Sequence, residues 1–243
     1  MFTTDAAVAA AVQNPARTIT DAIQTMQEID GACVDGDGLK WFNWLYLQVT
    51  QAIEKRISSG EFASPAWLAD LDVQFAQLYF DALKAALAGA PCPGCWGALF
   101  GCRNNQEIAR IQFALAGINA HINHDLCAAV VMTCKAAGVA PQHGTPQYED
   151  YTALNSTFDS LIDLAKKTLD VRLLGDPLPE VSHLADMIAA WDVAAARENA
   201  WVNAECLWNL PPLCAAGLMD SIDGLTTVVS KALLVPVPVI AGA

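Results

Sequence analysis

The amino-acid sequence predicts an all-α protein, a single globular helical domain of about seven or eight helices around two long buried helices. Apolar residues recur at helical spacing along most of the chain, and no stretch shows the alternation typical of a strand. No linker divides the chain, so residues 1–243 are expected to form one domain, with residues 1–14 and 235–243 at its periphery. A composition of 54% hydrophobic and 16% charged residues favours a large core and an apolar cavity.

Three helices are expected before the middle of the chain. Residues 15–30 and 39–58 form the first two, and a break rich in glycine and aspartate separates them. Ser64 and Pro65 suit the N-cap and the first position of the third helix. Asp72 interrupts the apolar stripe of that helix, which indicates a buried carboxylate rather than a solvated one.

Residues 88–101 are expected to form a loop that contains Cys92 and Cys95. Their CxxC spacing suits free thiols, a disulfide or half of a zinc site. A four-cysteine zinc site needs a second CxxC, which the sequence lacks. Thiols or an incidental disulfide remain as the two interpretations of this pair.

The central helix is expected within residues 103–138. Its core, residues 108–134, is long, almost wholly apolar and free of proline, so it must be buried on every side. Polar groups at the centre of a buried helix destabilise the fold unless each one finds a partner. This helix has five of them near its middle, namely Asn119, His121, Asn123, His124 and Asp125.

Three more helices are expected in the second half of the chain. Residues 148–174 show a clear apolar stripe, and Pro177 then breaks the pattern. Residues 179–209 form the second long helix, which ends at Pro211, and residues 213–234 form the last helix.

The central polar residues favour acid–base chemistry. His121 and Asp125 lie four residues apart, on one helix face, where the carboxylate can orient the imidazole and raise its basicity. Burying Asp72 beside them would let each group satisfy the other, so we expect Asp72 within about 8 Å of His121. The expected catalytic set is His121 as acid/base, Asp125 as its orienting partner and Asp72 as a second carboxylate.

Tryptophans and polar groups from other helices are expected to enclose this set and to bind the substrate. Arg197 or Glu198 would form the opposite wall, and Trp191 or Trp201 an apolar lid. The substrate-binding residues expected from the sequence are Trp41, Tyr79, Asn119, Trp191, Arg197 and Trp201.

Two other interpretations of the same residues stay open. His121, His124 and Asp125 are common metal ligands and can hold zinc, iron or manganese, which predicts a metal-dependent hydrolase or oxygenase. Alternatively, the polar residues form only a network that fixes helix register, in a non-catalytic protein that binds small molecules. The preferred function is an enzyme that cyclises, isomerises or eliminates from a hydrophobic small molecule.

Charge and hydropathy limit the partners. A net charge of −13 disfavours nucleic acid and anionic membrane surfaces. No apolar run is long enough and free enough of ionisable groups to span a membrane. The N-terminus lacks the basic segment of a signal peptide, so a cytoplasmic location is expected. The apolar content is compatible with a homodimer.

Several motifs together resemble those of a bacterial, mostly actinobacterial, domain family of unknown function. They are LADLDVQFAQLYFDAL at 68–83, FALAGINAHINHDL at 113–126, the YEDY start at 148, and ARENAW at 196–201. The most specific is NAHIN-x-DL, and the resemblance covers roughly residues 30–235.

The resemblance implies which positions the family shares, and it implies no reaction. Histidine stands in the family at the place of His121, arginine at that of Arg197, and aspartate at those of Asp72, Asp125 and Asp150. The position of His124 need not be histidine in the family. This favours His121 with Asp125 over the metal set.

Overall fold

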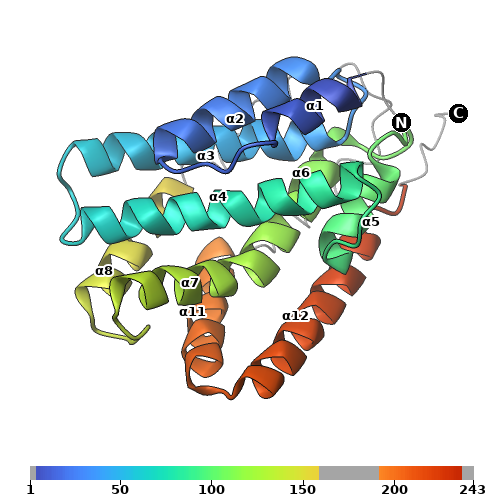
Figure 1. Cartoon of the computed structure of the whole chain (residues 1–243). Helices are drawn as coiled ribbons and strands as arrows, with labels where there is room; N and C mark the ends of the chain where they lie inside the picture. The colour runs from blue at the N-terminus through green and yellow to red at the C-terminus, as the bar shows by residue number, and fades with distance from the viewer. Residues whose placement is uncertain (1–3, 159–191, 237–243) are drawn as a thin grey trace, which may run out of the picture.

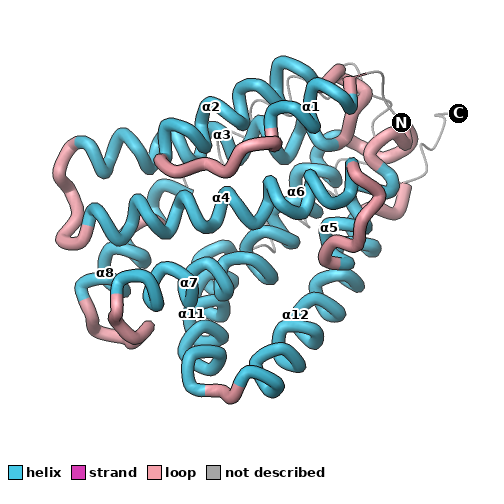
Figure 2. The backbone as a smooth tube through the Cα atoms, in the orientation of Figure 1, coloured by secondary structure: helices cyan, strands magenta, loops and turns pink. Residues whose placement is uncertain are grey.

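The computed structural model describes residues 4–158 and 192–236, and the regular structure in these ranges is entirely helical (Figures 1 and 2). The expectation of an all-α fold is therefore confirmed. The elements are α1 (Asp5–Ala11), α2 (Ile19–Ala32), α3 (Leu39–Ser58), α4 (Pro65–Leu87), α5 (Gly94–Cys102), α6 (Arg110–Ala120), the π-helical turn η1 (His121–Asp125), α7 (Leu126–Ala137), α8 (Pro146–Ala153), α11 (Val193–Asn209) and α12 (Pro212–Leu233).

The long apolar stretch runs through the middle of the fold, as the sequence predicts. Helices α6 and α7 and the turn η1 are continuous, and Gly138 ends them in the left-handed conformation that glycine adopts readily (φ 68°). Helices α3, α5 and α12 pack against α6, whereas α4 and α11 pack against α7. The central helix is thus covered on all sides, which its composition requires.

Helices α1 to α4 form one side of the molecule (Figure 1). A capping box starts α2, because Thr18 and Asp21 each accept the other's backbone N–H. Pro65 is the first residue of α4, as expected. The N–H groups of Ala63 and Ser64 donate to the carboxylate of Asp150 at α8, so this aspartate holds the start of α4.

The short helix α1 is largely exposed, at Ala6, Ala7 and Ala10, but contributes Val8 to the core. It packs on α2 and α4, and Val8 and Val12 are buried. Alanine dominates this segment, so its sequence offers too weak an apolar stripe to reveal the burial of one or two valines.

The expected loop at residues 88–101 is wrong, because α5 occupies most of it. The backbone N–H groups of Gly94 and Cys95, at the first turn of α5, donate to the carboxylate of Asp223 at 2.8 and 3.0 Å. This cap comes from α12, far along the chain, so no local signal announces the helix. Cys92 and Cys95 are free thiols, as are the other six cysteines.

Two expected helices differ in their bounds. Helix α8 starts at Pro146 after the cap Thr145, and a turn at Leu154 interrupts it before residues 155–158 continue as helix. The second long helix does not extend unbroken from 179, because Asp192 is extended and caps α11 through the N–H of Ala195. Residues 159–191, which both expectations include, lie outside the described ranges.

Helices α11 and α12 form a hairpin below the central helix, joined by a short turn (Figures 1 and 2). Gln112 ties the end of α12 to α6 by donating to the carbonyls of Leu233 and Val235. Among the helices described, none combines the length and apolarity that crossing a bilayer requires.

Candidate functional site

The polar centre of the chain coincides with an irregularity in the central helix. Residues His121–Asp125 form a π turn, in which the N–H of Leu126 donates to the carbonyl of His121. A π turn of this kind widens the helix by one residue and is frequent at functional sites. Here it places two histidine rings against one carboxylate.

Asp125 is the centre of a buried hydrogen-bond network. Its Oδ2 accepts from Nδ1 of His121 (2.9 Å) and from Nε1 of Trp96 (2.9 Å), and its Oδ1 accepts from Nδ1 of His124 (2.7 Å). The carboxylate is 2% exposed, so these three donors take the place of water. Each oxygen of Asp125 is therefore occupied from within the protein.

The three groups hold different charges. Burial raises the pKa of Asp125, but the hydrogen bonds from His121 and His124 outweigh it and lower this pKa below its ordinary value. Burial also opposes a charge on His124, yet Asp125 and Asp223 raise its pKa. For His121 burial dominates and lowers the pKa, despite Asp125. A coherent state follows: charged Asp125 and His124 beside a neutral His121.

The tautomer of His121 is fixed by its partner. A carboxylate only accepts, so Nδ1 of neutral His121 must carry the proton and Nε2 must carry a lone pair. Nε2 is buried, and none of the residues that the structure describes forms a hydrogen bond with it. An imidazole with an oriented proton on one side and a free lone pair on the other is the arrangement of a general base.

Aromatic rings enclose the imidazole of His121. The ring of Phe75 stacks on it, with centroids 3.4 Å apart and planes 7° from parallel. Four more rings lie around it with centroids at 4.5 to 6.3 Å, those of Tyr46, Phe42, Trp96 and Tyr79. This apolar surrounding keeps water from the imidazole and disfavours its charged form.

A cavity of about 50 Å³ lies beside His121, between α3, α4 and η1. The described residues that line it are apolar apart from His121 and Tyr46, and they come mainly from Phe42, Leu45, Tyr46 and Val49 of α3. These four follow one face of the helix at spacings of three and four residues. The cavity is thus a small apolar space that His121 helps to line.

A second cavity, of about 20 Å³, adjoins the first and contains the charged groups. Asp72 and Arg197 line it, and Tyr46, Val49 and Phe75 line both cavities. Oδ2 of Asp72 is buried and has no hydrogen-bond partner. Burial first, and the negative charge of Glu54 second, raise the pKa of Asp72 to about 7. This carboxyl is therefore partly protonated at neutral pH.

Asp72 and His121 thus lie on neighbouring cavities and make no direct hydrogen bond. The packing of α4 against the central helix follows the sequence-based expectation, and Asp72 is buried as expected. Between the two polar groups, however, α4 presents Phe75 to the imidazole, one turn along from Asp72. The partner of His121 is Asp125 alone, and Asp72 belongs to the environment of Arg197.

The expected substrate-binding residues fall into two groups. Tyr79 belongs to the rings around His121, and Arg197 lines the second cavity. Trp191 lies outside the described residues. The others lie elsewhere, and each has a structural role.

Three expected substrate-binding residues do not line either cavity. Trp41 faces the guanidinium of Arg110 (4.5 Å), because it lies on the opposite face of α3 from Tyr46. Asn119 donates to the carbonyl of Thr226 and to Ser230, and so joins α6 to α12. Trp201 packs in the core.

The expected wall residue Glu198 faces away from the cavities. Its carboxylate lies at the surface, where it accepts hydrogen bonds from His143 and Tyr148. Trp201 packs against Trp67, Tyr148 and Tyr151 and lines neither cavity, so it is not a lid.

The sequence argument did not assign Trp96 and Phe75 to the site, and it did not separate Phe42 and Tyr46 from their aromatic neighbours on the same helix. Phe42 and Tyr46 are four residues apart and share a stripe with Val49, so helical spacing alone separates them from Trp41. Phe75 lies one turn from Asp72 on α4. No sequence pattern near Trp96 predicts its helix, because the residue that caps α5 is Asp223 on α12.

The metal interpretation gains no support from this geometry. His121 and His124 direct their Nδ1 atoms at the oxygens of Asp125 rather than at a common point. Within residues 4–158 and 192–236, no group of three histidine, cysteine or acidic side chains is placed to hold a metal ion.

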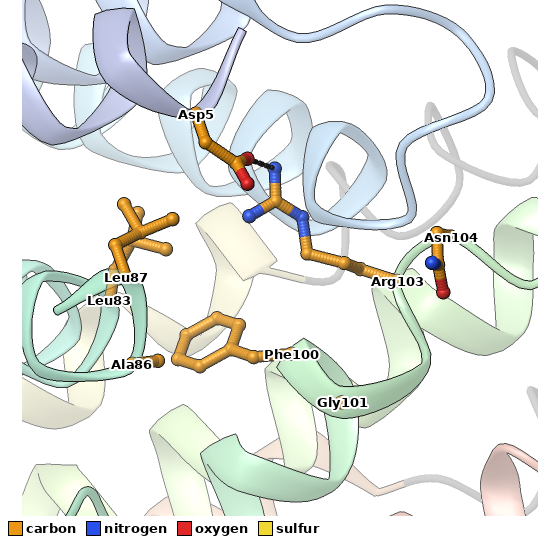
Figure 3. Close-up of a pocket in the computed structure, with 8 residues that line it drawn as sticks. All are labelled: Asp5, Leu83, Ala86, Leu87, Phe100, Gly101, Arg103 and Asn104. Carbon is orange, nitrogen blue, oxygen red and sulfur yellow. Dashed lines mark ion pairs between the residues drawn. The ribbon is translucent and has the colours of Figure 1, made fainter. Parts of the chain in front are cut away.

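A wider hollow of about 260 Å³ lies near α1, between α4 and α5 (Figure 3). Leu83, Leu87 and Phe100 form its apolar walls, and Arg103 lies at its edge. Arg103 is paired with Asp5 at 3.0 Å and also with Asp37, which is fully buried. Its charge is balanced within the protein, so this hollow lacks the unsatisfied groups of the cavities near His121.

Comparisons with known proteins identify the family. The model of a family of unknown function, DUF5995, matches residues 19–236. No curated protein and no solved structure gives a significant match. The match includes every residue of the two cavities and of the network around Asp125, and it spans nearly the whole chain. The chain belongs to the DUF5995 family.

Proposed function

We propose that the protein is an enzyme that acts on a hydrophobic small molecule by acid–base chemistry, with His121 as the catalytic residue. The observation that carries this proposal is the lone pair on Nε2 of His121, which is buried, unpartnered and beside an apolar cavity. A buried acceptor without a partner destabilises the fold by about 1–3 kcal/mol. A substrate that donates a hydrogen bond or a proton to Nε2 would supply the partner that this atom lacks among the described residues.

The chemistry follows from the network. Nε2 of His121 takes a proton from an acidic C–H or O–H of the substrate, and the imidazole becomes positively charged. Asp125 stabilises this charge through its bond to Nδ1, while His124 and Trp96 hold the carboxylate in place. Return of the proton to another carbon gives isomerisation or cyclisation, and its delivery to a leaving group gives elimination. The aromatic rings exclude water throughout.

The first test is the state of His121 itself. Imidazole nitrogen chemical shifts, measured by NMR on ¹⁵N-labelled protein, should show His121 neutral and protonated at Nδ1 at pH 6.5. Exposed His143 serves as internal reference, because its carboxylate partners Glu198 and Glu205 raise its pKa. A charged His121 at this pH, or a proton on Nε2, would contradict the proposal.

The second test uses turnover. The protein is incubated with a panel of hydrophobic metabolites in D₂O, and mass spectrometry follows deuterium uptake, isomerisation and loss of a leaving group. His121→Gln should lose the activity by about 10²-fold or more, since glutamine hydrogen-bonds but is not a base at neutral pH. His143→Gln, the matched surface control, should retain it. Activity that persists in His121→Gln overturns the assignment.

A non-catalytic binding protein is the second candidate. It rests on the same network, in which Asp125 and its three donors fix the packing of η1 and take part in no reaction. Under this alternative, His121→Gln alters stability and ligand affinity, and no metabolite is converted by the wild-type protein.

Two further proposals concern location and oligomeric state. We propose that the protein is cytoplasmic. We also propose that it is a homodimer, because the side chains of Leu213, Leu225 and Val228 on α12 are 85%, 73% and 67% exposed. The net charge of −13 argues against a nucleic-acid partner. Light scattering of the purified chain tests the dimer, and Leu225→Glu should weaken it.

A further inference from the structure

Arg197, on α11, is a buried cation. Its side chain is almost fully enclosed, with Nε donating to Oδ1 of Asn155 (2.8 Å) and Nη2 to the carbonyl of Tyr151 (2.6 Å). Its guanidinium lies over the rings of Tyr151 (4.1 Å) and Phe158 (4.5 Å). No carboxylate in the described ranges lies within ion-pair distance of it. A buried charge with neutral partners alone is strongly unfavourable.

Asp72 does not supply the missing charge. It lines the same cavity as Arg197, but the two side chains form no ion pair. Its Oδ2 is unpartnered, and burial raises its pKa to about 7, so at neutral pH a large fraction of it is a neutral carboxylic acid. In that form Asp72 can donate a hydrogen bond to an anion beside Arg197.

Tyr46 supplies another donor at the junction of the cavities. Its buried hydroxyl interacts with the side-chain hydroxyl of Thr50, and Tyr46 lines both cavities. Arg197, Asp72 and Tyr46 therefore line the same small cavity. The walls shared by the two cavities, at Val49 and Phe75, are apolar and lead to His121.

We propose that Arg197, Asp72 and Tyr46 form a subsite for the carboxylate of the substrate, whose apolar part lies against His121. This inference rests on the proposed function and names its substrate class: a hydrophobic monocarboxylic acid. A carboxylate is planar, carries one charge and pairs with a guanidinium in a matching geometry. A phosphate dianion is larger and brings a second charge, and Arg197 is the one cation among the described residues that line this cavity.

The proposed subsite also fixes the direction in which the substrate lies across the two cavities. The carboxylate lies at Arg197 and the adjoining carbon atoms pass Phe75 into the apolar cavity. The reacting hydrogen then lies a few carbon atoms from the carboxylate, at Nε2 of His121. Cavity volumes of about 20 and 50 Å³ limit the substrate to a small head group and a short apolar segment, and its entry requires the lining side chains to move.

The test measures binding of three probes that share one chain: hexanoate, hexan-1-ol and hexyl phosphate. Ligand-observed NMR gives each Kd for the full chain at pH 7. Hexanoate should bind at least about tenfold more tightly than the other two, which corresponds to one charge-assisted pair. Arg197→Met, which keeps the length of the side chain, should abolish this preference and leave hexan-1-ol unchanged.

Controls separate this inference from the proposed function. His121→Gln should keep the preference for hexanoate over hexan-1-ol, because the carboxylate lies at the other cavity and both probes share the chain that lies against His121. Equal binding of hexanoate and hexan-1-ol, or binding of none of the probes, overturns the carboxylate subsite and leaves the acid–base proposal standing. Preferred binding of hexyl phosphate assigns the subsite to phosphate instead. If Arg197→Met does not fold, Arg197→Lys and the wild-type preference among probes decide the question.

Discussion

Replacing Asp72 by asparagine should stabilise the protein in a pH-dependent way. The side chain is 5% exposed, and the pKa of about 7 lies well above the ordinary value of 3.8. The unfolded chain ionises near pH 4, whereas the folded protein keeps this proton until about pH 7. Stability from the protonated carboxyl is therefore present below pH 4 and is lost as the pH rises towards 7.

The magnitude follows from the shift. A difference of about 3 units at about 1.4 kcal/mol per unit gives an upper bound of about 4 kcal/mol between pH 4 and pH 8. The asparagine side chain does not ionise. The difference in free energy of unfolding between Asp72→Asn and the wild type should therefore increase, in favour of the variant, as the pH rises across this range. The other titrating groups are common to both proteins and cancel in the comparison.

Urea denaturation at pH 5, 6, 7 and 8, followed by tryptophan fluorescence, measures the difference. Asp70→Asn, on the same helix but exposed, is the matched control and should change the free energy of unfolding by less than about 0.5 kcal/mol at each pH. A difference between Asp72→Asn and wild type that stays constant from pH 5 to 8 would refute the reasoning, since it would mean that the carboxyl ionises normally in the fold.

Two further predictions concern packing and the network. A Cβ at Gly117 would lie 2.3 Å from the ring of Phe42, so Gly117→Ala should lower the free energy of unfolding by about 1–3 kcal/mol, whereas Gly101→Ala, with open space at its Cβ, should not. Trp96→Phe removes a donor from Asp125 and should destabilise the protein by about 1–3 kcal/mol in thermal unfolding. An unchanged melting temperature for Trp96→Phe would show that Asp125 does not depend on the indole.

The main parts of the fold follow from local sequence patterns. The central helix can be predicted from the sequence because apolar residues occupy nearly all of its positions. The polar residues at its middle indicate where the candidate site lies. The start of α4 at Pro65 and the bounds of α3 follow from capping and spacing. These features depend only on residues within one or two helical turns of each other, which is the range that a periodicity argument covers.

The remaining parts depend on contacts between distant segments. Helix α5 is capped by Asp223, so its sequence gives no sign of its start, and Trp96 could not be placed. The apolar stripe of α4 predicts that Asp72 is buried. It does not predict which side chains lie beside the carboxyl group of Asp72. Whether Phe75 or Asp72 meets His121 depends on the angle and register at which α4 crosses the central helix. Periodicity does not fix these quantities.

The cap on α5 has a consequence for the order in which the site is completed. Asp223 holds the first turn of α5, α5 carries Trp96, and Trp96 holds the carboxylate that orients His121. A nascent chain that has emerged only through α11 already contains the histidine and its aspartate, but not the residue that anchors α5. His121 is therefore held in the orientation described above only after α12 has been synthesised and has docked, so an incomplete chain contains His121 and Asp125 without the complete hydrogen-bond network.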